Sequence, residues 1–479
     1  MITAPSARWI CSVAILLAHA LSTNASEVPT ISTEPASVDR GPANSATPPP
    51  TIDQPPSAPP KPAPDSEVQF VGRSTNQFAA DLYARLATQD GNLFLSPASI
   101  ETALAMLSAG AHGRTEQQMS STLHLALPGD KLHPAFAQLL RRWNGENVPV
   151  DAPSPAGSQK PGDNPQPSPT TQPERLYELA AANSLWVQQE FALRPEFVGL
   201  SQQSYDAAVQ TVDFGAGDFA RQAINSWIAK RTRGKIPELV AAGSLSKDTR
   251  LILTNAIYFK GNWGSPFDAA RTTPQSFQKS ATDKLQVAMM NQQGTFKYFE
   301  QNGFQAIELP FAGGDLSMVV LISSKIDGLT ELTKRLTAEN LTTWIDHLSS
   351  ETVNVSLPRF KLSSQFQLSQ TLASLGMTDA FSTGADFSGI SMDEGLQLSE
   401  VLHQATVDVN EAGMEAAAAT GVVAVARSAR VSTPKEFKAD HPFVFLIHDR
   451  VSGAILFLGR LENPQPAETP PANPGGTDR

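Results

Sequence analysis

The sequence predicts an α+β fold, because helical signals come early in the chain and strand signals dominate its later part. Ser96 and Pro97 are typical of an N-cap and a first helical residue. Apolar residues then recur at helical spacing, at Ile100, Leu104, Leu107 and Ala111. The later strand-like segments span residues 251–259, 307–311, 316–322, 443–447 and 454–458. Helices and strands do not alternate along the chain, which disfavours a doubly wound parallel sheet.

The connections between these elements support the same assignment. Thr115 and Gln118 have the spacing of a capping box, which predicts that another helix begins there. Residues 312–315 (AGGD) and 449–453 (DRVSG) are glycine-containing turns between predicted strands. We therefore expect two β-hairpins in the later part of the chain.

Composition indicates one large globular domain with unstructured extensions. The chain has 479 residues, of which 41% are hydrophobic, and a formal net charge of −11. This acidic balance argues against a general affinity for nucleic acid or for anionic membranes. Residues 21–66 and 465–479 are rich in proline and small polar residues, and we expect them to be a disordered linker and a disordered tail. The domain is expected at 67–464, with a proline-rich insert at 148–173.

The first 20 residues predict a secretory signal peptide. Arg8 precedes an apolar run from Trp9 to Ala18, and small residues flank His19. The run is too short to span a bilayer comfortably, which disfavours a membrane anchor. Cys11 is the only cysteine and lies inside the signal, so the exported protein would contain no disulfide. These features favour a secreted, periplasmic or extracellular protein, and the composition favours a bacterial source.

Sequence patterns of catalysis and cofactor binding are largely missing. The chain has no Gly-x-Ser-x-Gly elbow, no His-Glu-x-x-His and no Walker loop, and its histidines lack the spacing of a zinc site. We expect no metal, no cofactor and no enzymatic activity. One match to a dinucleotide fingerprint, GAGDFA at 215–220, would suggest an oxidoreductase. Asp218 within it would face a bound pyrophosphate, and no repeated βαβ units follow, so we interpret the match as coincidental.

Residues 411–428, EAGMEAAAATGVVAVARS, are the most informative segment. They are small, contain no proline and end near a lone arginine. If the segment enters a sheet, side chains alternate between faces. Met414, Ala416, Ala418, Thr420, Val422 and Ala424 would then form one uncharged face that could be buried. The charge on Glu415 would fall on the opposite face.

Seven sequence blocks resemble the serpins. They lie at 92–111, 224–236, 253–263, 357–362, 375–381, 385–390 and 437–464, in the order of that family. The resemblance implies a serpin fold with large mixed and antiparallel sheets, about nine helices and an exposed reactive-centre loop. It also implies a monomeric suicide inhibitor, which traps a serine protease in a covalent complex as the cleaved loop inserts into the central sheet.

The same resemblance assigns roles to individual residues. The hinge of the loop would comprise Glu411, Gly413, Met414, Glu415, Ala416, Ala417, Ala418, Ala419 and Thr420. The family's spacing from the hinge glutamate places the reactive bond at Arg427–Ser428, which predicts a trypsin-like target. Arg430 is the alternative bait. Met414 stands where inhibitors carry a smaller residue, so we expect insertion to start slowly.

Other family positions are matched beneath and beside the central sheet. Ser96, Ser99, Asn255 and His403 would form a hydrogen-bonded cluster, and Trp263 would lie at the top of the opening sheet. The alternative is that His403 and Trp263 are ordinary core residues. A non-inhibitory serpin that acts as a binding module is the other functional reading.

Two groups of basic residues could suggest a heparin-type site. The first comprises Lys230, Arg231, Arg233 and Lys235, and the second Lys131, Arg141 and Arg142. We interpret both groups as solvated helix faces.

Overall fold

The computed structural model describes residues 66–144, 177–301, 303–414 and 433–467. The predicted signal peptide, residues 21–65 of the predicted linker, the insert, the predicted hinge residues 415–420 and the reactive bond lie outside these residues. The first three residues of the predicted tail are described. The Gln465 side chain bonds both the N–H and the C=O of Lys361, at 2.9 and 2.8 Å, and the Ala467 N–H donates to Gln286 O at 2.9 Å. The folded domain therefore reaches Ala467.

Most of the helices come early and strands dominate the later part of the chain, as predicted. The described α-helices are α1 (Ser66–Leu86), α2 (Pro97–Ser108), α3 (Gly113–Thr122), α4 (Gly129–Trp143), α5 (Pro195–Tyr205), α6 (Asp218–Arg231), α7 (Leu329–Lys334), α8 (Ala338–Asp346) and α9 (Ser369–Leu375). Ser96 caps α2 by accepting from the Ser99 N–H, and Pro97 follows as its first residue. The predicted start of α2 is therefore confirmed.

The capping box predicted from Thr115 and Gln118 is wrong. The structure begins α3 at Gly113, and no side chain caps it. The Thr115 hydroxyl instead accepts from the Asp386 N–H at 3.0 Å, and the Gln118 side chain accepts from the Asp379 N–H at 2.8 Å. Both side chains thus bond to residues more than 250 positions away in the chain and do not cap α3.

The described strands form two sheets. The six-stranded sheet has the order β10-β11-β12-β4-β2-β3, with β2 (Tyr177–Gln188), β3 (Ala208–Val212), β4 (Leu251–Asn262), β10 (Phe360–Gln367), β11 (Leu398–Asn410) and β12 (Gly413–Met414). The nine-stranded sheet contains β1 (Leu93–Leu95), β5 (Thr273–Gln278), β6 (Lys284–Gln301), β7 (Phe304–Pro310), β8 (Leu316–Ser323), β9 (Ser349–Pro358), β13 (Lys435–Lys438), β14 (Phe443–Asp449) and β15 (Ile455–Leu461). Both predicted hairpins, β7–β8 and β14–β15, are antiparallel pairs.

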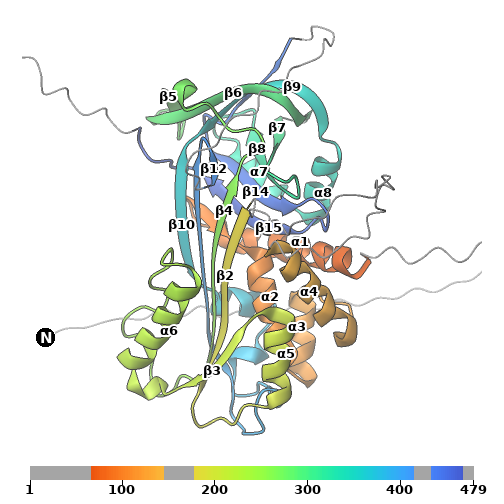
Figure 1. Ribbon diagram of the computed structural model, residues 1–479, viewed down its shortest axis with the longest axis vertical. Helices are drawn as coiled ribbons and strands as arrows, with labels where there is room; N and C mark the ends of the chain where they lie inside the picture. Colours follow the sequence, from red (N-terminus) through yellow and green to blue (C-terminus); the bar gives the residue numbers. More distant parts are fainter. Residues whose placement is uncertain (1–65, 145–176, 302, 415–432, 468–479) are drawn as a thin grey trace, which may run out of the picture. The chain divides into compact units, whose positions relative to one another are not determined.

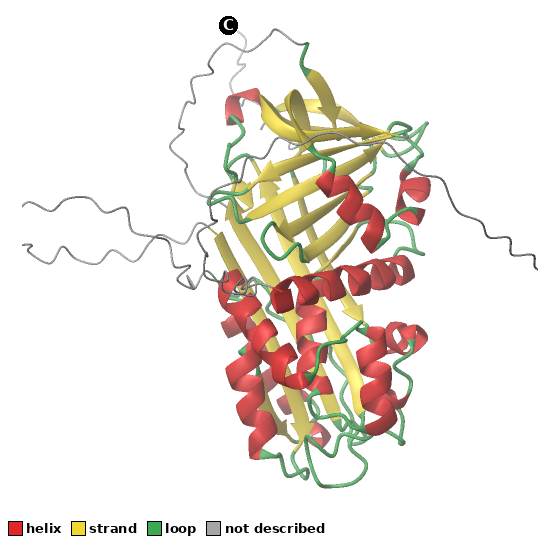
Figure 2. Cartoon of the chain, turned by 90° about the vertical axis from the view of Figure 1, so that its right-hand side faces the viewer, coloured by secondary structure: helices red, strands yellow, loops and turns green. Residues whose placement is uncertain are grey.

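The long strands of the six-stranded sheet separate two sets of helices. Figure 1 shows α6 on one side of these strands and α2 to α5 on the other, and Figure 2 shows helices gathered around the lower half of the long strands. Ile224 and Ile228 of α6 pack with Ile252 and Leu402 in a small core on one face. The main core lies on the other face and includes α2 residues such as Leu104.

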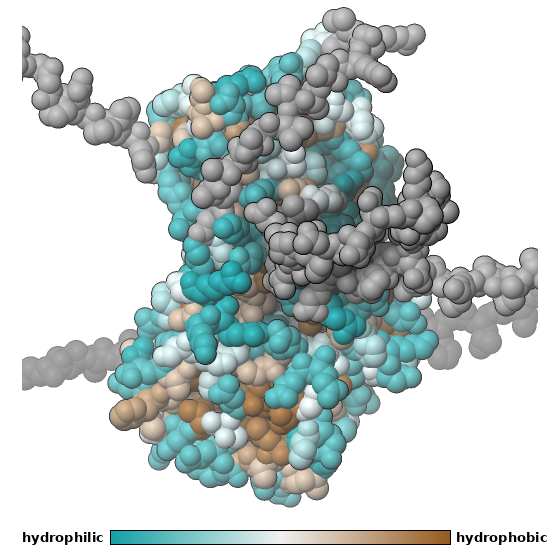
Figure 3. Space-filling model, in the orientation of Figure 1, coloured by the Kyte–Doolittle hydropathy of each residue, from teal (hydrophilic) through white to brown (hydrophobic). Residues whose placement is uncertain are grey.

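The face shown in Figure 3 is mostly hydrophilic, with hydrophobic residues gathered toward the lower end of that view. Large apolar side chains that are exposed in the described ranges are Phe219, Met392 and Val451. Within those ranges, no helix combines the length and the apolar character needed to cross a bilayer.

Candidate functional site: the hinge and the seam of the central sheet

Strands β4 and β11 meet in the middle of the six-stranded sheet, and we call their boundary the seam. They pair in parallel from Leu251 and Leu398 up to Tyr258 and Thr406. Above that point, the strands part and β12 lies between them. Gly413 and Met414 pair antiparallel with both neighbours, so the first two strand residues of the predicted hinge are already in the sheet.

Met414 faces the main core, as the alternation predicted, and its side chain is 0% exposed. Its partners are Val409 on β11 and Gly261 on β4. Met414 already lies in the sheet of the uncleaved chain, so a slow start of insertion would have to arise beyond this residue, and it stays a prediction. Further insertion would begin at Glu415.

Gly413 is required by the close approach of β4. Its φ of +145° lies in a region that other residues rarely adopt, and a Cβ at this position would be 2.2 Å from Gly261 O and 2.6 Å from the Asn262 Cα. Only glycine lets the chain enter the top of the seam here. This supports the hinge assignment from a contact that the sequence could not show.

Glu411 anchors the start of the hinge. Its carboxylate accepts from the Thr272 hydroxyl at 2.7 Å and from the Arg359 guanidinium at 2.5 Å. Burial raises the pKa of this carboxyl, but the hydrogen bonds from Arg359 and Thr272 outweigh that effect and leave its pKa below the usual value. Sequence reasoning identified Glu411 but missed both partners, because they lie in connections that are distant from it in the chain.

Trp263 closes the top of the seam. It is 3% exposed and stacks on Phe311 with ring centroids 4.9 Å apart. Its Nε1 donates to Asn410 O at 2.9 Å, and its backbone N–H donates to Ala412 O at 3.0 Å. The residue thus holds the two backbone carbonyls that flank Glu411.

The four residues predicted to cluster beneath the sheet do meet. The His403 Nδ1 and the Asn255 Oδ1 are 2.5 Å apart, and these residues are direct partners across the seam. The Asn255 amide donates to Ser99 Oγ at 2.6 Å, and the Ser96 N–H donates to His403 Nε2 at 3.1 Å. Asn183 of β2, which no sequence pattern indicated, also accepts from the Asn255 amide.

His403 is a neutral residue in this cluster. Its Nε2 accepts a hydrogen bond from the Ser96 backbone N–H, so its Nδ1 carries the ring proton and donates to Asn255 Oδ1. Complete burial lowers the pKa of His403 to about 3. The bond between His403 and Asn255 spans the seam and would have to break if another strand entered between β4 and β11.

The two basic groups are largely engaged within the chain. Arg231 pairs with Asp206 at 2.7 Å, Arg233 with Glu178 at 2.8 Å, and Lys235 lies over the Tyr258 ring. On α4, Lys131 lies 3.7 Å from Glu67, and Arg142 contacts Asp449 and Asp315 at 3.1 and 3.2 Å. These contacts favour structural roles over polyanion binding.

The GAGDFA segment does not form a nucleotide site. Gly215 and Ala216 belong to a short 3₁₀ turn, and α6 begins at Asp218. The preceding strand β3 is the edge of its sheet and pairs only with β2 among the described strands. Within the described residues, no group of three or more His, Cys, Asp or Glu side chains could hold a metal ion.

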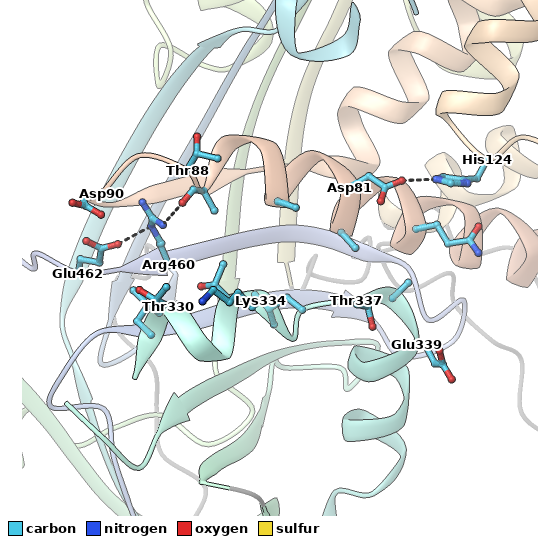
Figure 4. A pocket seen from close by; sticks show the side chains of 18 residues that line it. Asp81, Thr88, Asp90, His124, Thr330, Lys334, Thr337, Glu339, Arg460 and Glu462 are labelled. Carbon is cyan, nitrogen blue, oxygen red and sulfur yellow. Dashed lines mark hydrogen bonds and ion pairs between the residues drawn. The ribbon is translucent and has the colours of Figure 1, made fainter. Parts of the chain in front are cut away.

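A cavity of about 770 Å³ lies between α1, the α7–α8 region and the end of β15. Figure 4 shows Asp81 and His124 on one side of it, and Arg460 with Glu462 on another. The N–O distances are 2.8 Å between His124 and Asp81 and 2.9 Å between Arg460 and Glu462, so these polar side chains are bonded to each other within the chain. None of the lining residues belongs to the hinge or to the seam.

Comparison with known proteins identifies the family. A family model described as serpin, serine protease inhibitor, matches residues 73–464. The chain belongs to the serpin family. It is therefore related to inhibitors rather than to enzymes.

Individual serpins align over almost their whole length. Bovine leukocyte elastase inhibitor is 39% identical over 408 residues, which are 83% of this chain and 100% of the relative. Serpin48 of the insect Tenebrio molitor, described as a highly specific serpin, has 30% identity and a TM-score of 0.71, with 83% and 99% of the two chains covered. Human thyroxine-binding globulin, solved as a complex with thyroxine, has 27% identity and a TM-score of 0.71, with 83% and 100% covered.

Proposed function

We propose that this serpin is an exported, monomeric suicide inhibitor of trypsin-like serine proteases, with Arg427–Ser428 as its reactive bond. The observation that carries the proposal is β12. Gly413 and Met414 already pair with both strands of the seam, in the register that an inserting loop would continue. The hinge beyond them is a run of small residues without proline.

The seam offers one consistent register for that insertion. Met414 lies opposite Gly261 and Val409, so continuation of both pairings brings residue 420 opposite Asn255 and His403. The structure independently pairs Asn255 with His403 across the seam. Thr420 would therefore separate these two side chains, and its hydroxyl could replace their hydrogen bond.

Insertion would follow attack of the protease serine on the carbonyl carbon of Arg427. This step releases the amine of Ser428 and leaves the protease joined to the loop as an ester. Each inserted residue gains a backbone hydrogen bond worth about 1 kcal/mol net, and a buried valine adds about 2 kcal/mol. Over the inserting segment the sum is on the order of 10 kcal/mol, which would draw the protease along with the loop.

The name of the bovine relative suggests a protease of different specificity, an elastase. The loop of this chain contains small apolar residues, among them Val425 and Ala426, that an elastase could cleave, whereas Arg427 suits a trypsin-like pocket. We favour trypsin-like specificity because the hinge glutamate and the family's spacing select Arg427. The bacterial source and export are supported by the cysteine-free mature sequence and the signal-like first 20 residues.

Incubation with trypsin and, separately, with elastase tests the proposal. We expect trypsin to give a covalent band on a denaturing gel and a short released peptide that begins at Ser428. A peptide that begins at Val431 would make Arg430 the bait. A covalent band with elastase alone, with a peptide starting at Ala426 or Arg427, would overturn the trypsin-like assignment. Arg427→Ala should abolish the trypsin band and leave the fold intact.

The cavity between α1 and the α7–α8 region favours a second candidate function, that of a binding module. Its volume of about 770 Å³ suits a small organic molecule, and a solved relative carries thyroxine. A protein that is cleaved by trypsin without a covalent band, and that binds hydrophobic small molecules in a thermal-shift screen, would favour this candidate.

A further inference from the structure

Glu101 is a fully buried carboxyl group in the middle of α2, and the proposed inhibitory mechanism makes no use of it. Its side chain is 0% exposed. Among the described residues, no lysine, arginine or histidine forms an ion pair with it. An ionised carboxylate in such a place lacks the partner that normally makes burial of a charge tolerable.

The hydroxyl groups around Glu101 also carry too few protons to satisfy both an ionised carboxylate and the neighbouring backbone carbonyls. In the described part of the chain, two hydroxyls donate to it: Ser74 Oγ, at 2.8 Å, and Thr75 Oγ1. Each hydroxyl has one proton, and each has competing backbone acceptors. The Ser74 hydroxyl is 2.8 Å from Leu123 O and 3.1 Å from His124 O, and the Thr75 hydroxyl is 2.9 Å from Val71 O.

Protonation of Glu101 resolves this shortage. The carboxylic acid can donate its own proton to one hydroxyl oxygen. The hydroxyl that receives this proton is then free to donate to a backbone carbonyl. The hydrogen-bonding groups where α1 meets α2 and the end of α3 thus all find partners most readily when Glu101 is neutral.

Nearby titratable groups supply no compensating positive charge. Tyr205, at the end of α5, is bonded to the His133 ring at 2.6 Å. Burial, with a further contribution from Glu101, raises the pKa of the Tyr205 phenol, and burial lowers the pKa of His133. Both groups are therefore neutral near pH 7. The His124 ring is paired with Asp81, at 2.8 Å.

We propose that Glu101 is a neutral carboxylic acid in the folded protein and acts as a pH-sensitive latch between α1 and α2. The proton leaves to solvent as the pH rises, and the charge that remains has no partner in the core. Burial raises the pKa of Glu101 from 4.5 to about 8, against a smaller lowering by Thr75 and Ser74. The proposal concerns the intact domain and stands whether or not the inhibitory function is confirmed.

The latch lies on the helix that supports the seam. The N-cap of α2, Ser96, bonds to His403, and Ser99 in its first turn bonds to Asn255. Ionisation of Glu101 would loosen α2 directly beneath the strands that must part for insertion. If the chain is an inhibitor, its intact form would then lose activity faster on storage above pH 8 than at pH 6.

The sign of the effect follows from the two pKa values. The unfolded chain releases the Glu101 proton near pH 4.5 and the folded chain near pH 8. The stabilisation by this group is therefore complete below pH 4.5 and is lost as the pH rises to 8. Between these limits, the unfolded state binds one proton fewer than the folded state. Each rise of one pH unit therefore shifts the equilibrium about tenfold toward the unfolded state.

The test compares urea unfolding of the full-length protein with that of Glu101→Gln from pH 5 to pH 9. The glutamine keeps the size and the donor of the neutral acid. We expect the wild type to lose stability relative to the variant up to about pH 8, with no further relative loss above it. Glu116→Gln is the matched control, because Glu116 is exposed on α3. Its stability should change with pH as that of the wild type does. Parallel profiles for wild type and Glu101→Gln would overturn the proposal.

Infrared spectroscopy provides a second measurement that does not depend on how the variant folds. The wild type at pH 6 should show the carbonyl stretch of a protonated, non-exchanging carboxylic acid. This band should fade around pH 8 and should be missing from Glu101→Gln. A wild-type spectrum without such a band at pH 6 would also overturn the proposal.

Discussion

Replacement of Ala418 by arginine tests the insertion register that β12 defines. Met414 lies opposite Val409 and Gly261, so four residues later position 418 would come opposite Ala405 and Ile257. Ala405 and Ile257 are 0% and 2% exposed and belong to the main core. An arginine at 418 would therefore enter the core as the loop inserts.

The cost of that burial decides the outcome. An uncompensated charge in a protein core costs about 3–5 kcal/mol. If most of this cost is present in the transition state, insertion slows on the order of 100-fold or more, since about 1.4 kcal/mol corresponds to a factor of ten. The protease would then hydrolyse the ester before it is trapped. Ala418→Arg should turn the inhibitor into a substrate.

The assay is the number of inhibitor molecules consumed per trypsin molecule inactivated, together with the covalent band on a denaturing gel. Glu415→Arg is the matched control, because position 415 would face Lys260 and Asp408 on the partly exposed side of the sheet. The control should retain the covalent band, whereas Ala418→Arg should lose it and still be cleaved. An unchanged stoichiometry for Ala418→Arg would refute the assignment of the faces.

Two further predictions concern the described part of the hinge. Met414→Thr replaces a buried side chain in the seam with a smaller one and should destabilise the intact protein by about 2 kcal/mol. It should not improve the stoichiometry of inhibition. An unchanged thermal midpoint would contradict the burial of Met414 between β4 and β11. Arg359→Ala should cost about 2 kcal/mol at pH 7 by removing a charge-assisted hydrogen bond from Glu411. Because the pKa of Glu411 is lowered in the fold, its stabilisation is present above pH 4.5 and is lost as the pH falls further. The difference in urea midpoint between wild type and Arg359→Ala should therefore shrink below pH 4.5, and a difference that is independent of pH would count against the ion pair.

Local patterns in the sequence predicted most of the elements that long apolar runs define. The strand expected at 251–259 is β4, and the two hairpins join strands within three residues of the expected limits. Such runs are informative because burial of one or both faces requires apolar residues at fixed intervals. The start of α2 was also predictable, because its cap is formed by adjacent residues.

Long-range partners were not predictable in the same way. The sequence identified Glu411 and Asn255 through the serpin resemblance but gave no indication of Arg359, Thr272 or Asn183. The capping box failed for the same reason, since Asp386 and Asp379 take the two side chains that a local cap would use. Hydrogen bonds between residues distant in the sequence depend on the tertiary fold, and the spacing of residues along the chain does not encode them.

The thermal midpoints of the intact and the cleaved protein test the central claim most directly. Cleavage after Arg427 should free the loop to insert beyond Met414 and to gain on the order of 10 kcal/mol. Since about 1 kcal/mol moves the midpoint of a domain of this size by about 1 °C, differential scanning calorimetry should place the cleaved form at least ~10 °C above the intact form. Coincident midpoints would contradict insertion and would favour the binding module as the function of this serpin.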